Sequence, residues 1–281
     1  MLTFDTLTKD QSFVRLLRTS LMRLEKQYRT PVDVEFAVQI VPKYPQPEFK
    51  LWILQCRPLS QRSEGEAVSV PTNIAPESVL FSEYRLVPNG KVEGIRYIVF
   101  VDPNRYREIS DVPTKLEIGR AIGRINKQLE NDSFILMGPG RWGSSNLELG
   151  VKVGYADIYN TKVLIEIAAK DASGGRPELS YGTHFFQDLV EAGIYSLPLH
   201  LDSPKSKMDW QFLREAENVL GVISAEDQHL DHAIRIIDLA QHANQRLHIY
   251  MDAANDEAVG YLASVIDEPN ALSNGSKIAS F

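Results

Sequence analysis

The apolar residues near the start of the chain change their spacing at Thr30-Pro31. Before this point they recur at helical intervals, at Phe13, Leu16, Leu17, Leu21, Leu24 and Tyr28. This spacing predicts an amphipathic helix from about Asp10 to Tyr28, which Thr30-Pro31 ends. From Val32 to Ile40 apolar and polar residues alternate, which predicts a half-buried strand. A proline-rich loop and a second strand from Leu51 to Arg57 complete a compact unit.

Polar side chains follow the same alternation. It places Asp33 and Glu35 on one face of the first strand, roughly 7 Å apart, and Gln55 and Arg57 on one face of the second. If the strands pair, all four share a surface. Phosphoryl transfer from ATP needs such a mixture, because carboxylates hold Mg²⁺ and an arginine neutralises phosphate charge. On the pattern alone, the more common explanation is a hairpin with a solvated face, in which Glu35 and Arg57 form a cross-strand ion pair.

Two motifs strengthen the first interpretation. The first lies within Leu24–Ala37, where Pro31 is followed in order by one variable position, Asp33, a hydrophobic residue, Glu35 and an aromatic residue. The second is Leu-Gln-Cys-Arg-Pro, which ends the segment Leu51–Pro58. In order and separation they resemble the phosphoenolpyruvate/pyruvate-binding nucleotide domain of pyruvate phosphate dikinases and phosphoenolpyruvate synthases. That resemblance implies an ATP-grasp fold and the cofactors ATP and Mg²⁺. It also implies that Glu35 coordinates Mg²⁺ with Asp33 beside it, and that Gln55 and Arg57 contact the phosphates or the phosphoryl acceptor.

The resemblance covers residues 4–60, the later part of such a domain. Family members transfer the β-phosphoryl group of ATP to a histidine on a separate domain, leaving AMP. An earlier lobe supplies a glycine-rich loop, a lysine and an arginine. We therefore expect a fragment, a split subunit or a remnant of a dikinase-type phosphotransferase, inactive alone, whose missing lobe comes from another domain or subunit. The expected ligands are a nucleotide and a small phosphorylated or carboxylate metabolite.

The rest of the chain reads as α/β, so the fold class is α/β (α+β), a partial ATP-grasp lobe followed by a second α/β domain. The expected divisions are residues 1–60, a linker at 61–67, an α/β domain at 68–225, and an acidic, partly helical tail at 226–281 with a frayed end. Short strands are expected within 68–101 and at 134–137, 151–155, 163–167 and 247–251. Helices are expected at 114–129, capped by Thr114 with Glu117 in a capping box, and at 183–192, 210–220 and 229–243.

A glycine-rich loop follows the strand predicted at 134–137. Its backbone amides could hold an anion with the help of Arg141, and the candidate residues are Gly138, Gly140, Arg141 and Gly143. Ser144 stands where a phosphate-loop lysine would be, and strand follows where a helix is required. A structural turn that uses glycine for positive φ is the alternative. An anion- or metabolite-binding or docking module, without catalysis, is therefore the rival function.

His184 is a candidate phosphohistidine, because Gly182-Thr183-His184 is similar to the phosphohistidine segment of dikinases. The similarity is incomplete, since one residue is missing and Phe185 and Phe186 replace two alanines. A histidine at the start of a helix capped by Thr183 is the alternative.

Composition narrows the protein class further. Cys56 is the one cysteine among 281 residues, which excludes an internal disulfide and fits a reducing compartment. No secretory signal and no apolar stretch of about 20 residues is present, so we expect a cytoplasmic protein that does not enter a membrane. Residues 1–60 carry nine Lys or Arg and six Asp or Glu, whereas residues 200–281 carry six and thirteen. This balance suits a nucleotide at the front and argues against nucleic acid.

Overall fold

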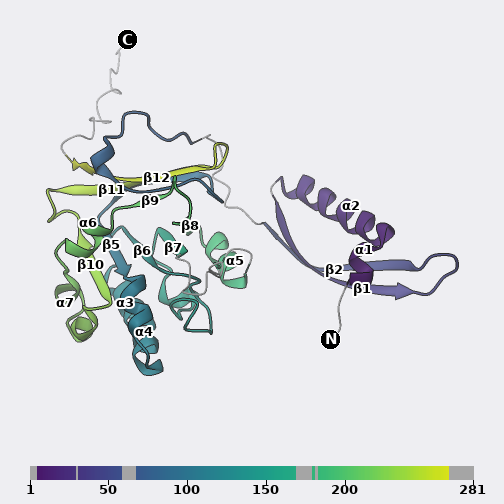
Figure 1. Ribbon diagram of the computed structural model, residues 1–281, viewed down its shortest axis with the longest axis horizontal. Coiled ribbons are helices and arrows are strands. Elements are labelled where there is room, and N and C mark those ends of the chain that lie inside the picture. Colours follow the sequence, from purple (N-terminus) through teal and green to yellow (C-terminus); the bar gives the residue numbers. More distant parts are fainter. Residues whose placement is uncertain (1–4, 30, 59–67, 169–178, 181–182, 266–281) are drawn as a thin grey trace, which may run out of the picture.

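The computed structural model describes residues 5–29, 31–58, 68–168, 179–180 and 183–265. Residues 5–58 form a small unit of helices and a hairpin, and residues 68–265 form a larger body. Figure 1 shows the small unit beside the body, with α5 (His184–Glu191) on the side of the body that faces it. Within the described ranges, no helix combines the length and the apolar character that a bilayer crossing requires.

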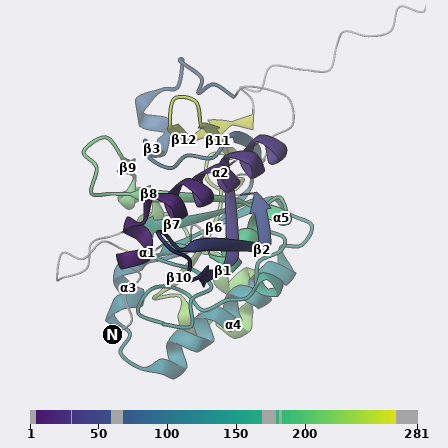
Figure 2. The same cartoon turned by 90° about the vertical axis from the view of Figure 1, so that its right-hand side faces the viewer.

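The small unit confirms the helix, loop and strands expected at the front. Its elements are α1 (Asp5–Lys9), α2 (Gln11–Tyr28), β1 (Val32–Val41) and β2 (Glu48–Pro58). Asp10 caps α2, because its Oδ1 accepts hydrogen bonds from Ser12 N at 2.8 Å and Phe13 N at 3.1 Å. The strands pair antiparallel, and α2 lies along one face of the hairpin (Figures 1 and 2).

The larger body contains two five-stranded sheets together with several helices. Its strands are β3 (Val79–Glu83), β4 (Gly90–Ile95), β5 (Tyr97–Val101), β6 (Phe134–Pro139), β7 (Val163–Ala168), β8 (Tyr195–His200), β9 (Lys207–Met208), β10 (Ile234–Asp238), β11 (Gln245–Asp252) and β12 (Glu257–Ser264). Its helices are α3 (Pro103–Glu108), α4 (Val112–Gln128), α5, α6 (Trp210–Glu215) and α7 (Leu220–Ile223), with 3₁₀ turns at Pro76–Ser78, Tyr155–Asp157 and Ala225–Leu230.

The two sheets differ in strand direction. One has the order β10-β5-β6-β7-β8, in which β5 to β8 run parallel and β10 is antiparallel. The other has the order β4-β11-β12-β3-β9 and is antiparallel throughout. This mixture of helices, parallel strands and antiparallel strands confirms the α/β class.

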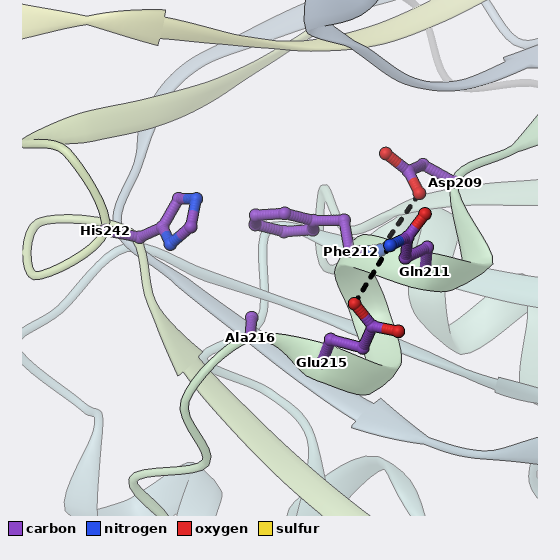
Figure 3. A pocket seen from close by; sticks show the side chains of 6 residues that line it. All are labelled: Asp209, Gln211, Phe212, Glu215, Ala216 and His242. Carbon is purple, nitrogen blue, oxygen red and sulfur yellow. Dashed lines mark hydrogen bonds between the residues drawn. The ribbon is translucent and has the colours of Figure 1, made fainter.

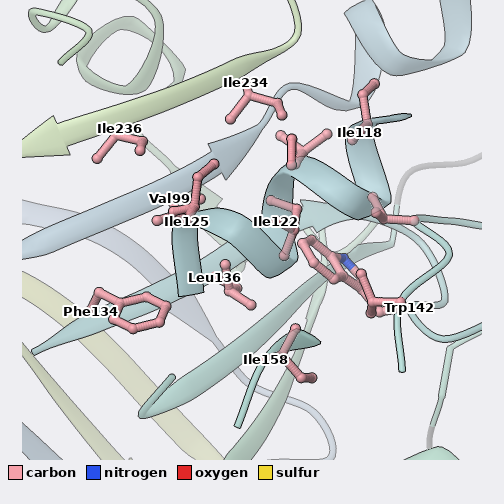
Figure 4. Packing of buried hydrophobic residues seen from close by; sticks show 14 of the residues in the cluster. Val99, Ile118, Ile122, Ile125, Phe134, Leu136, Trp142, Ile158, Ile234 and Ile236 are labelled. Carbon is pink, nitrogen blue, oxygen red and sulfur yellow. The ribbon is translucent and has the colours of Figure 1, made fainter. Parts of the chain in front are cut away.

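The parallel sheet is buried on both faces. Along β5, Val99 belongs to the cluster shared with the helices, whereas Phe100 belongs to the cluster shared with the antiparallel sheet. Strands buried on two faces read as continuous apolar runs, which explains the unbroken apolar sequence from Tyr97 to Val101. In Figure 4, Ile122 of α4 lies against Leu136 of β6 and its neighbours on the helical side of the sheet.

Two expectations within 112–155 are wrong. α4 begins at Val112, and Asp111 rather than Thr114 is its cap, because Asp111 Oδ1 accepts from Thr114 N at 2.8 Å. Pro113 lies in the first turn, where a residue without an N–H is tolerated. The segment 151–155 is not a strand; Val151 and Val153 are buried without a ladder, and a 3₁₀ turn begins at Tyr155. Alternating burial there reflects packing against the helical cluster.

Two further helix predictions, in the later part of the chain, are also wrong: one segment is not helical and the other holds two short helices. The range 229–243 holds the end of a 3₁₀ turn and β10, because the β-branched residues of Ile234–Ile237 pair with β5. The helix expected at 210–220 divides into α6 and α7. Between them, Asn218 Oδ1 accepts from Leu220 N at 3.1 Å and Ile236 N at 2.9 Å, so its side chain competes with helical backbone bonding.

The domain boundaries stay predictions. The expected linker at 61–67 and the frayed last fifteen residues lie outside the described residues. Strand pairing joins residues 234–264 to β3, β4 and β5, so this part of the expected acidic tail shares its sheets with residues 79–101.

Candidate functional site

Four polar side chains lie on one face of the β1–β2 hairpin. Asp33 is the cross-strand partner of Arg57, and Glu35 is the partner of Gln55. Residues two apart on a strand point to the same face, and cross-strand partners share it. Asp33, Glu35, Gln55 and Arg57 are named the polar quartet below. The structure therefore brings the four predicted residues to one surface; their binding of metal or phosphate stays a prediction.

Arg57 is oriented by its neighbour within the polar quartet. With the Gln55 amide oxygen turned toward the guanidinium, it accepts from Arg57 Nε at 2.7 Å and from Nη2 at 2.6 Å. The Arg57 side chain is 26% exposed and the Glu35 side chain 51% exposed. The guanidinium is thus held in place, while the Glu35 carboxylate is open to solvent.

The opposite face of the hairpin is apolar and partly covered by α2. The ring of Phe13, which is buried, lies 5.5 Å from Phe49 and 6.5 Å from Phe36. The strand register slips beside the quartet, because Glu35 faces Gln55 and Phe36 faces Ile53, which leaves Leu54 as an extra residue in β2. Such bulges bend a strand and re-aim nearby side chains, and they are common next to active sites.

Helix α5 of the larger body touches the polar quartet. His184 Nε2 lies 3.5 Å from Glu35 Oε1, an ion pair when the imidazole is protonated, and Arg57 Nη1 lies 3.8 Å from Glu191 Oε1. His184 is the first residue of α5 and its side chain is 76% exposed. Thr183 caps the helix, since its Oγ1 accepts from Phe186 N at 3.3 Å. The structure thus has the helix-start arrangement and also brings His184 to Glu35, which sequence spacing does not predict.

The glycine loop, residues 138–143, uses its backbone donors inside the protein. Gly140 N donates to Ile167 O at 3.0 Å, Arg141 N to Leu149 O at 2.7 Å and Gly143 N to Val151 O at 3.0 Å, and Trp142 N donates to a carboxylate on β7 at 2.9 Å. Gly140 has φ +52°, in the left-handed region that glycine adopts without strain. Because an anion cradle requires unpaired amides, these bonds favour the structural turn over the anion site.

Comparison with known proteins bears on the front of the chain. Residues 5–78 match the family model described as pyruvate phosphate dikinase, AMP/ATP-binding domain. They are similar to a nucleotide-binding domain of a dikinase. The match supports ATP binding by this segment, named the dikinase-like region below, and it includes the whole polar quartet. Neither the curated proteins nor the solved structures contain a match to the chain.

The donor set of the dikinase-like region suits one kind of metal. Within the described part of the chain, no three or more His, Cys, Asp or Glu side chains gather to hold an ion by themselves. Mg²⁺ does not require such a cage, because it usually keeps several waters and binds through one or two carboxylates together with substrate phosphates. The two carboxylates of Asp33 and Glu35 could meet that requirement.

The larger body contains a buried carboxylate that the sequence patterns above did not identify as a candidate. Glu166, on β7, is 1% exposed; its Oε1 accepts from Trp142 N at 2.9 Å, and its Oε2 accepts from Ser180 N at 2.7 Å. Burial raises the pKa of Glu166 to about 7, against the opposing effect of bonds from Ser180 and Trp142 and of the Arg141 charge. A single acid inside the apolar run Val163–Ala168 was the available signal.

A second buried acid joins the two sheets. Glu83 on β3 accepts from Tyr84 N at 2.8 Å, from Ser206 Oγ at 3.1 Å and from His200 N, and its side chain is fully buried. His200 Nδ1 lies 3.7 Å from Glu83 Oε1. Because Ser206 bonds the carboxylate and not the imidazole, this group lacks the nucleophile–base contact of a hydrolytic triad. It ties β8 to β3.

A hollow of about 330 Å³ lies beside α6. Figure 3 shows Phe212 and His242 facing each other across it, and their rings are 5.0 Å apart in an edge-on arrangement. Its acids are already bonded, since Asp209 caps α6 through Phe212 N at 2.9 Å and Glu215 accepts from Gln211 Nε2 at 3.0 Å. The chemistry of this hollow does not favour a particular ligand.

Proposed function

We propose that the dikinase-like region binds ATP with Mg²⁺ and takes part in dikinase-type phosphoryl transfer as one part of an ATP-grasp site. The observation that carries the proposal is the polar quartet, two carboxylates, an amide and a guanidinium on one open face of a hairpin, inside the segment that matches an AMP/ATP-binding domain. A cytoplasmic location, where ATP is available, fits this role.

The quartet divides into two roles. Glu35, with Asp33 beside it, would bind Mg²⁺ bridging phosphate oxygens, because carboxylates are the ligands this ion accepts alongside phosphates. Arg57 would neutralise charge on the transferring group, and a guanidinium already fixed by Gln55 loses less freedom when it binds. Gln55 therefore positions Arg57 and offers its own amide to the phosphates.

An open hairpin face does not exclude water or fix a triphosphate from several sides. Phosphoryl transfer depends on such positioning. We therefore propose that another domain or subunit completes the site. We also propose that a small phosphorylated or carboxylate metabolite is the final acceptor of the phosphoryl group. Residues 5–58 alone would bind the nucleotide weakly and turn nothing over.

His184 is our candidate for the phosphoryl acceptor, because its exposed imidazole already lies 3.5 Å from Glu35. In this step the Nε2 lone pair attacks the β-phosphorus of ATP, and the bond to the bridging oxygen of AMP breaks. AMP leaves with that electron pair. The pyrophosphoryl group then loses its γ-phosphate to water, which leaves phosphohistidine. The acid-labile phosphorus–nitrogen bond of phosphohistidine gives a distinct ³¹P NMR signal. If the chain lacks this signal after incubation with MgATP and the completing lobe, His184 is not the phosphoryl acceptor.

Thermal melting with ATP and Mg²⁺ tests the nucleotide site. We expect MgATP to raise the melting temperature of the full chain, because a ligand that binds only the folded state stabilises it by about 1.4 kcal/mol at ten times its Kd. Glu35→Gln keeps the shape of the side chain, removes the metal-binding charge and should abolish the part of the shift that requires Mg²⁺ and is lost in EDTA. Glu25→Gln, on the exposed surface of α2, is the matched control and should retain it.

Three results would count against the proposal. One is a Mg²⁺-dependent shift that survives Glu35→Gln and Arg57→Gln. Another is a shift abolished only by Arg141→Gln, which would favour the rival anion-binding module centred on the glycine loop. The absence of any shift, even with the completing lobe added, would leave residues 5–78 as a structural extension.

A further inference from the structure

A second hollow, separate from the one beside α6, lies in the small unit between α1, α2 and the loop that joins β1 to β2. Its volume is about 900 Å³, and it is lined by Lys9, Asp10, Gln11, Ser12, Arg15, Leu16, Thr19, Arg23 and Gln46. It shares no residue with the polar quartet, which lies on the hairpin face that α2 does not cover. We name it the basic hollow.

The charge of the basic hollow is not balanced. Lys9, Arg15 and Arg23 are cationic, and their side chains form no ion pair or hydrogen bond with another residue in the described part of the chain. Asp10 is the single acid of the lining. Its Oδ1 accepts from Ser12 N, Ser12 Oγ and Phe13 N, so its carboxylate serves the helix cap. Three cations and one carboxylate therefore line the cavity, an arrangement that a bound anion would stabilise.

The spacing of these cations follows from the helix. Arg15, Thr19 and Arg23 are four residues apart, which places them along one side of α2 at a rise of about 6 Å per step. Thr19 Oγ1 is bonded to Arg15 O at 2.7 Å, so the hydroxyl belongs to the helix and the two guanidiniums are the ligand donors of this side. Lys9 at the end of α1 and Gln46 from the loop add donors from the other walls.

We propose that the basic hollow binds a small polyanion made of linked phosphate groups. Guanidiniums present paired N–H donors that match phosphate oxygens, and lysine adds a point charge. Two arginines separated by two helical turns suit a chain of phosphates better than a single phosphate, because successive groups can each meet a cation. The ligand is either free inorganic polyphosphate or the phosphate chain of a nucleotide.

This inference goes beyond the proposed function and does not depend on it. The polar quartet needs Mg²⁺ to bind phosphates, because it contributes two carboxylates. The basic hollow supplies positive charge directly, so its binding persists when the metal is removed. The two sites are therefore distinguishable by a chelator and by the variants that abolish each one.

The test is calorimetric titration of the full chain with tripolyphosphate in the presence of EDTA. Arg15→Gln and Arg23→Gln retain a good helix former while removing one charge each. We expect each to weaken binding about tenfold, and the pair to weaken it about a hundredfold. Arg18→Gln is the matched control, because Arg18 is exposed on the same helix and does not line the hollow. Arg18→Gln and Glu35→Gln should both bind tripolyphosphate as the unaltered chain does.

Titrations with ATP and with adenosine, again in EDTA, identify the source of the phosphates. Equal affinities for ATP and tripolyphosphate support recognition of the phosphate chain alone, and a tighter, Arg15-dependent affinity for ATP supports a nucleotide. Three results would overturn the inference: no binding of tripolyphosphate or ATP, binding unchanged in the double variant, or an equal loss in Arg18→Gln, which would indicate diffuse attraction to the helix.

Discussion

Glu166 is expected to make the stability of the larger body depend on pH. Its carboxyl is buried on β7 and is bonded by Trp142 N and Ser180 N. Burial raises the pKa of Glu166 to about 7 from the ordinary value of 4.5. A carboxyl whose pKa is raised by folding stabilises the folded state only while it carries its proton.

The bonds from Trp142 N and Ser180 N favour the carboxylate of Glu166, whereas the position of the Ser180 hydroxyl offers the protonated form one compensating bond. Ser180 Oγ lies 2.8 Å from Trp142 O and also bonds Glu166 Oε1. A hydroxyl has one proton, so it can satisfy one of these two acceptors. When Glu166 Oε1 is protonated it donates to Ser180 Oγ, and the Ser180 proton is then available to Trp142 O. The protonated acid therefore completes one more hydrogen bond than the carboxylate does.

The sign and size of the effect follow from the two pKa values. Below pH 4.5 the group is protonated in both the folded and the unfolded chain. Between pH 4.5 and about 7 the folded chain holds the proton and the unfolded chain has lost it, so the free energy of unfolding falls as the pH rises. The fall attributable to Glu166 is about 3 kcal/mol over this window, at 1.36 kcal/mol for each unit of pKa difference.

Urea denaturation of the full chain, followed by tryptophan fluorescence from about pH 5 to about pH 8, compares the unaltered protein with Glu166→Gln. Glutamine in either amide orientation turns an N–H toward Trp142 N or Ser180 N, so the variant should be about 1–3 kcal/mol less stable at the acidic end. The difference should shrink or reverse at the alkaline end, because only the unaltered chain loses stability through Glu166. Parallel stability curves at all pH values would refute the reasoning.

Two further substitutions test the packing described above. Ile122→Ala removes a fully buried side chain of the helical cluster and should lower the free energy of unfolding by about 2–5 kcal/mol, whereas Val222→Ala, at a side chain 82% exposed, should change it by less than about 0.5 kcal/mol in the same denaturation assay. Gly140→Ala would place a Cβ 1.9 Å from Leu149 O, so its loss of melting temperature should clearly exceed that of Gly193→Ala, which has a similar positive φ and open space around it; equal losses would contradict the crowding at Gly140.

The small unit could be predicted from the sequence because its signals are local. The change of apolar period at Thr30-Pro31 separates α2 from β1, and the side chain of Asp10 caps the helix from the neighbouring residue. Strict alternation also fixes which side chains share a face once two strands pair. The polar quartet therefore followed from the positions of Asp33, Glu35 and their partners.

The remaining features depend on contacts distant in sequence. The segment from His229 to Ala243 has apolar residues compatible with a helix, but pairing with β5 makes part of it a strand. Asn218, between α6 and α7, bonds the backbone of β10. The contact between His184 and Glu35 joins residues from separate units. None of these partners can be identified from periodicity within one segment, because the competing local interactions are of similar strength.

The order of strands in the antiparallel sheet has a consequence for protein synthesis. β11 and β12 lie between β4 and β3 in space, yet the ribosome makes them about 150 residues later, roughly ten seconds or more at ordinary elongation rates. Until Gln245–Ser264 emerge, the nascent chain carries Leu80, Phe81 and Ile95 without the strands that cover them in the finished protein. Exposed strand edges of this kind are binding sites for chaperones and starting points for aggregation, so a chain that stalls or is cut before Gln245 is expected to be retained by chaperones or lost to inclusion bodies.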